Sequence, residues 1–326
     1  MSLSRDLRVF ASNVVGPGVG EIFYLVTNRT TDKYYLLLNK RRVSESSIFT
    51  TLASAYAAMT AGQNDTLLVF PGDHVITSEV TWAKDGTNIV GVGSKNQRHQ
   101  PSTLTAEGVR ITCKTAAVSY CITVSGKYVQ MFDIGTFNSA AATTNLGDIH
   151  VTGRNFSATR CAFRGGNEAT QVQSATSGIP VTISTDAYGF KFTECEIGSA
   201  GNTTRTTGPG FVRFASGAGG AGLFDRCAFS MRSETTGANA SGFTVEQTSL
   251  DRLLTFRTCT FYNFSENWGA LPDYMFNIDQ TTTFDIVLHV GCCMAGFDIV
   301  SDSARVKTSD PLPHTNVAES LAVATS

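Results

Sequence analysis

Asp225-Arg226-Cys227-Ala228-Phe229 is one of four related five-residue stretches in the chain. In each of them a large apolar residue follows the cysteine by two positions. In three of the four a phenylalanine precedes the cysteine by three positions. The cysteines are separated by 34, 32 and 32 residues, so the sequence repeats with a period above 30, which is typical of solenoids. The other three stretches are Thr159-Arg160-Cys161-Ala162-Phe163, Thr193-Glu194-Cys195-Glu196-Ile197 and Arg257-Thr258-Cys259-Thr260-Phe261.

The even spacing of these cysteines argues against a metal site or a disulfide framework. Zinc ligands occur as close pairs at short spacing. A buried cysteine behaves as a small apolar residue, so one cysteine per coil, stacked along a core, fits the pattern. Cys292-Cys293 continues the series 33 to 34 residues after Cys259 and is also expected to remain reduced. If Cys292 is the cysteine of the repeat, His289 falls in the column held by Phe192, Phe224 and Phe256, which predicts a buried side chain.

Short runs that alternate between apolar and polar residues fill the rest of each repeat. No helical period separates them, so a βαβ fold is excluded, whereas a sandwich of hairpins stays open as an alternative. The sustained period favours an all-β parallel solenoid. The runs are 109–113, 121–124, 128–132, 149–151, 180–184, 211–214, 243–246 and 274–278.

Composition excludes several classes of function. Charged residues make up 16% of the chain, against roughly 25% in an average domain, and the formal net charge is −2. This balance gives no electrostatic footprint for nucleic acid. The N-terminus has no long apolar segment, and no stretch approaches the ~18 apolar residues of a membrane span. The five histidines are scattered, so we expect no metal and no cofactor, in a protein made in a reducing cytoplasm.

The residue before each repeat cysteine is charged in three of the four repeats. It is Arg160, Glu194, Arg226 and then Thr258. Stacked coils bring equivalent side chains to about 4.8 Å from one another. Opposite charges on successive coils would then attract, so we expect a structural ladder of ion pairs here.

The start of the repeat region resembles a known superfamily. Residues 47–59 have helical apolar spacing, Asp65-Thr66 leads an apolar run that ends at Pro71-Gly72, and Ile89-Val90-Gly91-Val92-Gly93 follows. This order is similar to the opening of the pectate-lyase-like β-helix superfamily, over roughly residues 47–300. The resemblance implies a right-handed parallel β-helix with an N-terminal capping helix. The superfamily includes lyases, hydrolases, phage tailspikes and plain virion proteins, so the resemblance says little about activity.

The two ends of the chain lie outside the β-helix region. Within residues 1–46, Glu21–Thr27 and Lys33–Asn39 predict a small β-hairpin module that resembles the anchoring segment of phage spike and fibre proteins. Residues 301–326 predict a polar C-terminal extension or arm. We therefore expect an anchoring segment at 1–46, a parallel β-helix at 47–300 and an extension at 301–326.

Carboxylates on neighbouring coils are the candidates for catalysis. Superfamily lyases hold calcium with such groups and use an arginine or lysine as base, and hydrolases use a pair of carboxylates. Here Glu194 and Glu196 share one coil, and Asp225 lies on the next beside Arg226. The alternative is that these residues only form the charge ladder. No string in the sequence matches a lyase or polygalacturonase motif.

Five polar segments recur at one phase of the coil and predict a loop-bearing side: 135–148, 165–178, 199–210, 230–241 and 263–273. Phe264 and Trp268 in the last of them are candidates for glycan binding. We expect a non-enzymatic virion structural protein, such as a capsid decoration, vertex or tail-attached component, located in the virion. Its partners would be other virion proteins and copies of itself, as a homo-oligomer such as a trimer. The alternative is a tailspike-like protein that binds or cleaves a host polysaccharide.

Overall fold

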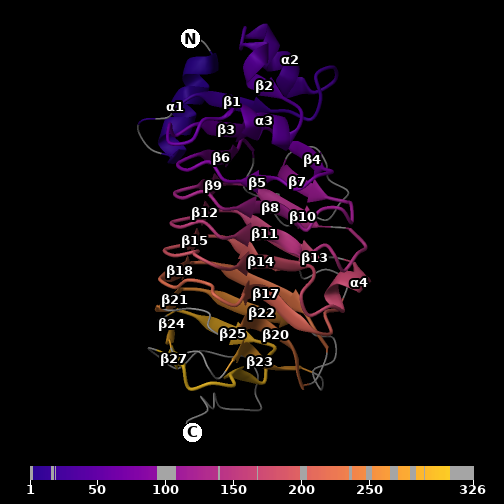
Figure 1. Cartoon of the computed structure of the whole chain (residues 1–326), viewed down its shortest axis with the longest axis vertical. Coiled ribbons are helices and arrows are strands. Elements are labelled where there is room, and N and C mark those ends of the chain that lie inside the picture. Colours follow the sequence, from indigo (N-terminus) through magenta and orange to yellow (C-terminus); the bar gives the residue numbers. More distant parts are fainter. Residues whose placement is uncertain are drawn as a thin grey trace.

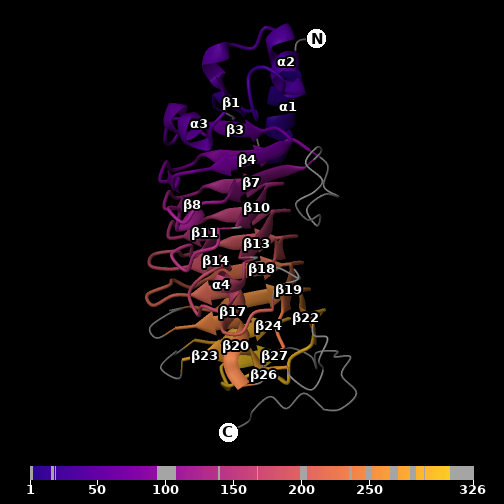
Figure 2. The ribbon, with the colours of Figure 1, turned by 90° about the vertical axis from the view of Figure 1, so that its right-hand side faces the viewer.

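The computed structural model is an elongated stack of coils, with the first described residues at one end of the stack and the last described residues at the other (Figures 1 and 2). It describes residues 3–15, 18, 20–93, 108–138, 140–166, 168–198, 204–234, 237–246, 252–264, 271–279, 284–289 and 291–308. In this part of the chain the strands form three parallel sheets, and each full coil contributes one strand to each sheet in turn. The prediction of an all-β parallel solenoid is confirmed.

The three sheets are named A, B and C in the order in which a coil passes through them. Sheet A contains β1 (Ile22–Leu25), β2 (Ile48–Phe49), β3 (Thr66–Val69), β6 (Asn88–Gly91), β9 (Gln130–Phe132), β12 (Ser157–Thr159), β15 (Lys191–Thr193), β18 (Gly222–Asp225), β21 (Leu254–Arg257), β24 (Ile286–Leu288) and β27 (Val306–Thr308). Sheet B contains β4 (Gly72–Ile76), β7 (Val109–Cys113), β10 (Gly135–Asn138), β13 (Ala162–Gly166), β16 (Glu196–Ile197), β19 (Ala228–Arg232), β22 (Thr260–Phe264) and β25 (Cys293–Ala295). Sheet C contains β5 (Thr81–Trp82), β8 (Tyr120–Val124), β11 (Gly147–Val151), β14 (Ile179–Ile183), β17 (Gly208–Phe214), β20 (Gly237–Val245), β23 (Pro272–Ile278) and β26 (Ile299–Ser301).

Aromatic side chains stack along the inside of the coils. Phe192, Phe224 and Phe256 are register partners in sheet A, and consecutive rings lie 4.9 Å apart at 14° and 7°. The repeat cysteines are buried behind them. The thiol of Cys227 donates to the carbonyl of Phe192 in the preceding coil at 3.5 Å, and Cys259 donates to Phe224 at 3.4 Å. The predicted cysteine column is therefore part of the core and also links successive coils.

The residues before the repeat cysteines turn the chain from sheet A into sheet B. Arg160, Glu194, Arg226 and Thr258 all have left-handed backbone conformations, with φ of 53°, 52°, 51° and 53°. This conformation is uncommon for residues other than glycine. In the first three it aims the N–H at a carbonyl of the next coil: Arg160 donates to Thr193 at 2.9 Å, Glu194 to Asp225 at 2.9 Å and Arg226 to Arg257 at 2.8 Å. The sharp corner is thus stabilised by the coil stacked on it.

Three helices lie at the N-terminal end of the stack. They are α1 (Leu3–Val15), α2 (Lys33–Lys40) and α3 (Leu52–Ala58), and a short 3₁₀ turn, η1 (Glu45–Ser47), precedes β2. Helix α3 buries Leu52 and Ala55 against the interior of the first coils, and Tyr56 packs on Trp82 at 4.7 Å. The predicted capping helix is therefore present, although residues 48–49 of the segment form a strand. Helices α1 and α2 instead share a separate apolar cluster with the outer face of sheet A.

The predicted β-hairpin at Glu21–Thr27 and Lys33–Asn39 is wrong. The first half contains β1, but β1 pairs in parallel with β2 and β3 and extends sheet A. The second half is helix α2, because the carboxylate of Asp32 accepts hydrogen bonds from the N–H groups of Tyr34 and Tyr35 and caps the helix. Tyr35 and Leu38, three residues apart, are its buried residues.

Two further predictions differ from the structure near the C-terminus. The sheets continue past residue 300, since β26 ends at Ser301 and β27 at Thr308; the rest of the proposed 301–326 extension lies outside the described residues. His289 is exposed, not buried. Leu288 takes the register position of the phenylalanine column opposite Phe256, because four residues rather than three separate it from Cys292.

Candidate functional site

The three candidate carboxylates each pair with an arginine. Glu194 lies 3.3 Å from Arg226 in the next coil, and Glu196 lies 3.2 Å from Arg164 in the preceding coil. The predicted attraction between Glu194 and Arg226 is confirmed. Asp225 is almost fully buried and lies between two guanidinium groups. The two glutamates thus pair with coils on opposite sides of their own.

Asp225 has the electrostatics of a structural anion. Its Oδ1 accepts from Nε of Arg257 at 2.7 Å, and Nη1 of Arg226 lies 2.9 Å from its Oδ2. The hydrogen bond from Arg257 holds the pKa of Asp225 below its usual value, and the charges of Arg226 and Arg257 act in the same direction. A carboxyl group with a lowered pKa stays ionised at neutral pH and is a poor general acid. This arrangement suits the linking of coils better than proton transfer.

The loop-bearing side is confirmed by the topology. Each of the five predicted segments connects a strand of sheet B to a strand of sheet C, and helix α4 (Ala169–Val172) extends from this side (Figure 1). Phe264 ends β22, is 42% exposed and packs edge-on against Tyr262 at 4.2 Å. Trp268, the other candidate for glycan binding, lies outside the described residues.

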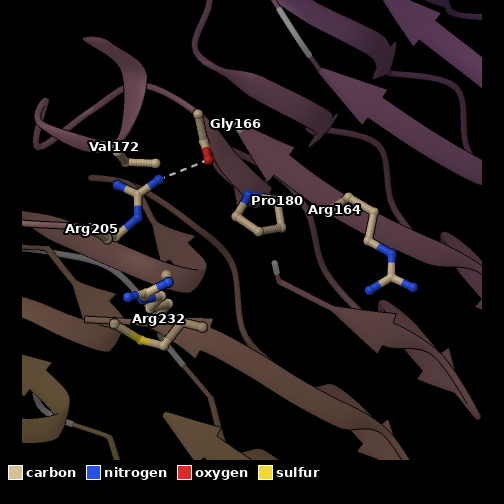
Figure 3. A pocket seen from close by; sticks show the side chains of 9 residues that line it. Arg164, Gly166, Val172, Pro180, Arg205 and Arg232 are labelled. Atoms are coloured by element: carbon tan, nitrogen blue, oxygen red, sulfur yellow. Dashed lines mark hydrogen bonds between the residues drawn. The ribbon is translucent and has the colours of Figure 1, made fainter. Parts of the chain in front are cut away.

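A narrow pocket beneath α4 is lined by arginines but is too small for a sugar. It has room for about one water molecule. Arg205 is buried there, and its guanidinium donates to the carbonyls of Ser177, Gly178 and Thr207 at 3.3, 2.8 and 3.1 Å. Arg164 and Arg205 lie on opposite sides of Pro180 (Figure 3). Arg205 therefore ties neighbouring loops together, and burial lowers its pKa to about 10.

The outer face of sheet C carries a different set of polar side chains. Its strands run down the middle of Figure 1. Side chains alternate along each strand, so that Ile149 and Val151 are buried while His150 between them is partly exposed. Register pairs continue this outward column through the stack, in the order Thr123, His150, Thr182, Arg213 and Thr244. We call this set the outer column.

His150 and Ser184 form a hydrogen-bonded pair on this face. The Nε2 atom of His150 lies 2.5 Å from Oγ of Ser184, which follows β14 in the next coil. The imidazole stacks on the ring of Tyr120 at 4.5 Å and 26°, which fixes its orientation. Burial lowers the pKa of His150; the charge of Glu79 opposes this shift and that of Arg213 adds to it. The imidazole is therefore neutral at pH 7.

Charged groups flank the pair on both sides. Nε of Arg213 lies 2.6 Å from Oε1 of Glu246 in the next coil. Like His150 and Ser184, these two residues lie on neighbouring coils but are not register partners. Glu79 accepts a hydrogen bond from Thr123 at 2.8 Å. The outer face of sheet C thus combines a hydroxyl, a neutral imidazole, a guanidinium and a carboxylate on adjacent strands. Sequence reasoning missed this site, because its members are single residues of four different coils.

Two kinds of site are not found in the part of the chain that the structure describes. No group of three or more His, Cys, Asp or Glu side chains there is placed to hold a metal ion. No helix among the described residues is long and apolar enough to cross a membrane.

Known proteins resemble this chain only in structure. No protein-family model and no curated protein matches the sequence. A pectin methylesterase from Aspergillus niger superposes with a TM-score of 0.54 at 11% identity, over 92% of this chain and 91% of that one. The chain has a right-handed parallel β-helix fold.

Two further structures superpose less closely on the chain. Pectate lyase Pel9A has a TM-score of 0.49 at 14% identity, over 93% of this chain and 80% of that one. The ORF18 protein of Geobacillus virus E2 has a TM-score of 0.44 at 12% identity, over 82% of this chain and 56% of that one. At these identities the likeness concerns the fold alone.

Proposed function

We propose that this pectate-lyase-like β-helix is the rigid body of a virion structural protein, a capsid decoration, vertex or tail-attached component. The observation that carries the proposal is that the candidate carboxylates form ion pairs between coils. Glu194, Glu196 and Asp225 all pair with arginines of adjacent coils, so the acidic groups that would serve a lyase or glycosidase instead join the coils. Such a body needs no turnover.

The N-terminal end supports an anchoring role. Helices α1 and α2 pack on the outer face of sheet A and not inside the coils. Leu36 and Leu37 of α2 remain exposed, at 51% and 40%. Apolar side chains at one end of a stiff rod suit contact with a neighbouring virion protein or with another copy of the chain. We propose a homo-oligomer, with a trimer as the first state to test.

The first experiment combines light scattering with an assay for new reducing sugar ends. The purified full-length chain should elute as one defined oligomer and release no sugar ends from a panel of bacterial polysaccharides. Its peptides should also be detected by mass spectrometry in particles purified on a density gradient. Release of sugar ends by the wild type, abolished in Asp225→Asn and Glu194→Gln, would overturn the structural proposal.

A second candidate function is glycan recognition at the outer surface. Phe264 supports it, because an exposed aromatic ring beside the loop-bearing side can stack on a sugar. Binding of a polysaccharide by the wild type that weakens in Phe264→Ala would favour this role. Val75→Ala, which truncates a side chain that is 47% exposed in another coil, is the matched control.

A further inference from the structure

The pairing of His150 with Ser184 is not required by the stacking of the coils. The outer column is otherwise made mostly of threonine, and threonine on the surface of a sheet needs no imidazole beside it. A serine hydroxyl within hydrogen-bond reach of a neutral imidazole is the arrangement that activates serine as a nucleophile. We propose that Ser184 and His150 are the nucleophile and general base of an esterase site. The site would cleave short acyl esters on an extended polysaccharide lying along sheet C.

The site is built on rigid elements. His150 belongs to β11 and pairs in register with Thr182 of β14, so Ser184, two residues further on, projects to the same side. The backbone N–H of Ser184 donates to the carbonyl of Val151 at 3.0 Å, which fixes the serine against the coil that carries the histidine. Tyr120 holds the ring from the other side. Both reacting groups are partly exposed, and a substrate can therefore reach them.

The reaction needs no group beyond these residues and water. The Oγ of Ser184 attacks the ester carbonyl carbon while its proton passes to Nε2 of His150. The tetrahedral intermediate collapses, the bond from carbon to the alkoxy oxygen breaks, and the imidazolium returns the proton to the departing alcohol. Water, deprotonated by His150, then attacks the acyl-serine and releases the carboxylic acid and Ser184.

The shape and polarity of this face indicate the class of substrate. Four of the five side chains in the outer column, all except the buried Thr182, are partly exposed, so the column forms a polar strip along the axis. An extended polar polymer with small acyl groups matches such a strip. This inference adds an activity to the proposed structural role and does not depend on it, because oligomer formation and esterase turnover are measured separately.

The test uses the full chain with 4-nitrophenyl acetate, and with a fluorophosphonate probe whose site of attachment is mapped by peptide mass spectrometry. The wild type should hydrolyse the ester and carry the label on Ser184. Ser184→Ala should abolish hydrolysis, because it removes the nucleophile, and His150→Gln should lower the rate by at least about 100-fold, the size of a general-base contribution. His289→Ala removes an exposed histidine elsewhere and should leave the rate unchanged. Cys293→Ser removes a partly exposed thiol and should also leave the rate unchanged.

His150→Gln separates catalysis from folding. Glutamine can keep the hydrogen bond to Ser184 but cannot take up its proton, so the melting temperature should stay near that of the wild type while hydrolysis is lost. Absence of label on Ser184, or equal rates in the wild type and His150→Gln, would overturn the esterase assignment. Release of acetate from an O-acetylated polysaccharide should accompany hydrolysis of the small ester. Hydrolysis of the small ester alone would refute the polymeric substrate.

Discussion

Nε of Arg257 lies 2.7 Å from Oδ1 of Asp225, a residue of the preceding coil that is 2% exposed. Arg226, in the same coil as Asp225, forms an ion pair with the other carboxylate oxygen. One buried anion thus joins two guanidinium groups at the corner between sheets A and B. A similar contact joins Arg160 to Asp133, with hydrogen bonds of 2.9 and 2.7 Å. Ion pairs of this kind hold coil to coil along one edge of the β-helix.

Replacing Asp225 with asparagine should destabilise the protein. The change removes the negative charge from between two arginines and weakens a charge-assisted hydrogen bond, so the free energy of unfolding should fall by about 1–2 kcal/mol. Urea denaturation followed by circular dichroism measures this. Asp186→Asn is the matched control, because the pair of Asp186 with Arg154 is exposed on both sides and should contribute less than about 0.5 kcal/mol. Equal losses in the two variants would contradict the role given to Asp225.

Asp148 gives the stability a dependence on pH that can be tested. Its carboxylate is fully buried, with Oδ2 accepting from Oγ1 of Thr136 at 2.7 Å and from the N–H of Gly165 at 2.8 Å. Burial raises its pKa from 3.8 to about 6. Because the folded pKa is raised, the stabilisation is complete below about pH 3.8 and is lost as the pH rises through 6.

The wild type should therefore lose about 2–3 kcal/mol of stability between pH 4 and pH 7 relative to Asp148→Asn, which cannot titrate. Urea unfolding of both proteins across this range gives the difference directly. Other carboxylates contribute equally to both proteins and cancel. A difference that stays constant with pH, or that grows in favour of the wild type as the pH rises, would show that Asp148 does not titrate as proposed.

The repeat could be recognised in the sequence because stacking places the equivalent residue of every coil in the same environment. Phe224 and Cys227 recur with their neighbours since each packs on its own equivalent, and the sign change from Glu194 to Arg226 follows from the same contact. The left-handed backbone at these positions gave no such signal, because arginine and glutamate are unusual there. The stacked coil, not the residue type, stabilises that conformation.

Two features could not be predicted from the sequence for different physical reasons. The apolar run of α2 is typical of a strand. It forms a helix because Tyr35 and Leu38 are buried by tertiary packing and Asp32 caps its N-terminus. The pairing of His150 with Ser184 depends on coil length. Register partners lie 27 residues apart between β9 and β12 but 34 apart between β12 and β15, so the neighbour of a given residue cannot be found by counting.

Arg205→Met should destabilise the side of the β-helix that carries α4. The substitution leaves the carbonyls of Ser177, Gly178 and Thr207 without their shared donor, at a cost of about 2–4 kcal/mol if the loops do not rearrange. Arg232→Met, in the same pocket, removes a partly exposed guanidinium that pairs with Glu234 and should cost less. Limited proteolysis should show faster cleavage near α4 in Arg205→Met alone. Unchanged cleavage would contradict the role of Arg205 in holding the neighbouring loops together.

The thiols should be hidden from reagents in the folded protein. Cys293 is partly exposed, whereas the other seven of the eight cysteines are buried and all eight are free. Burial raises the pKa of Cys161 and of Cys195, so these core thiols are both inaccessible and protonated. Titration with a chromogenic disulfide reagent should detect about one thiol per native chain and eight after denaturation. Cys293→Ser should abolish the native signal; rapid native labelling of further thiols would mean that the cysteine column is not a closed part of the core.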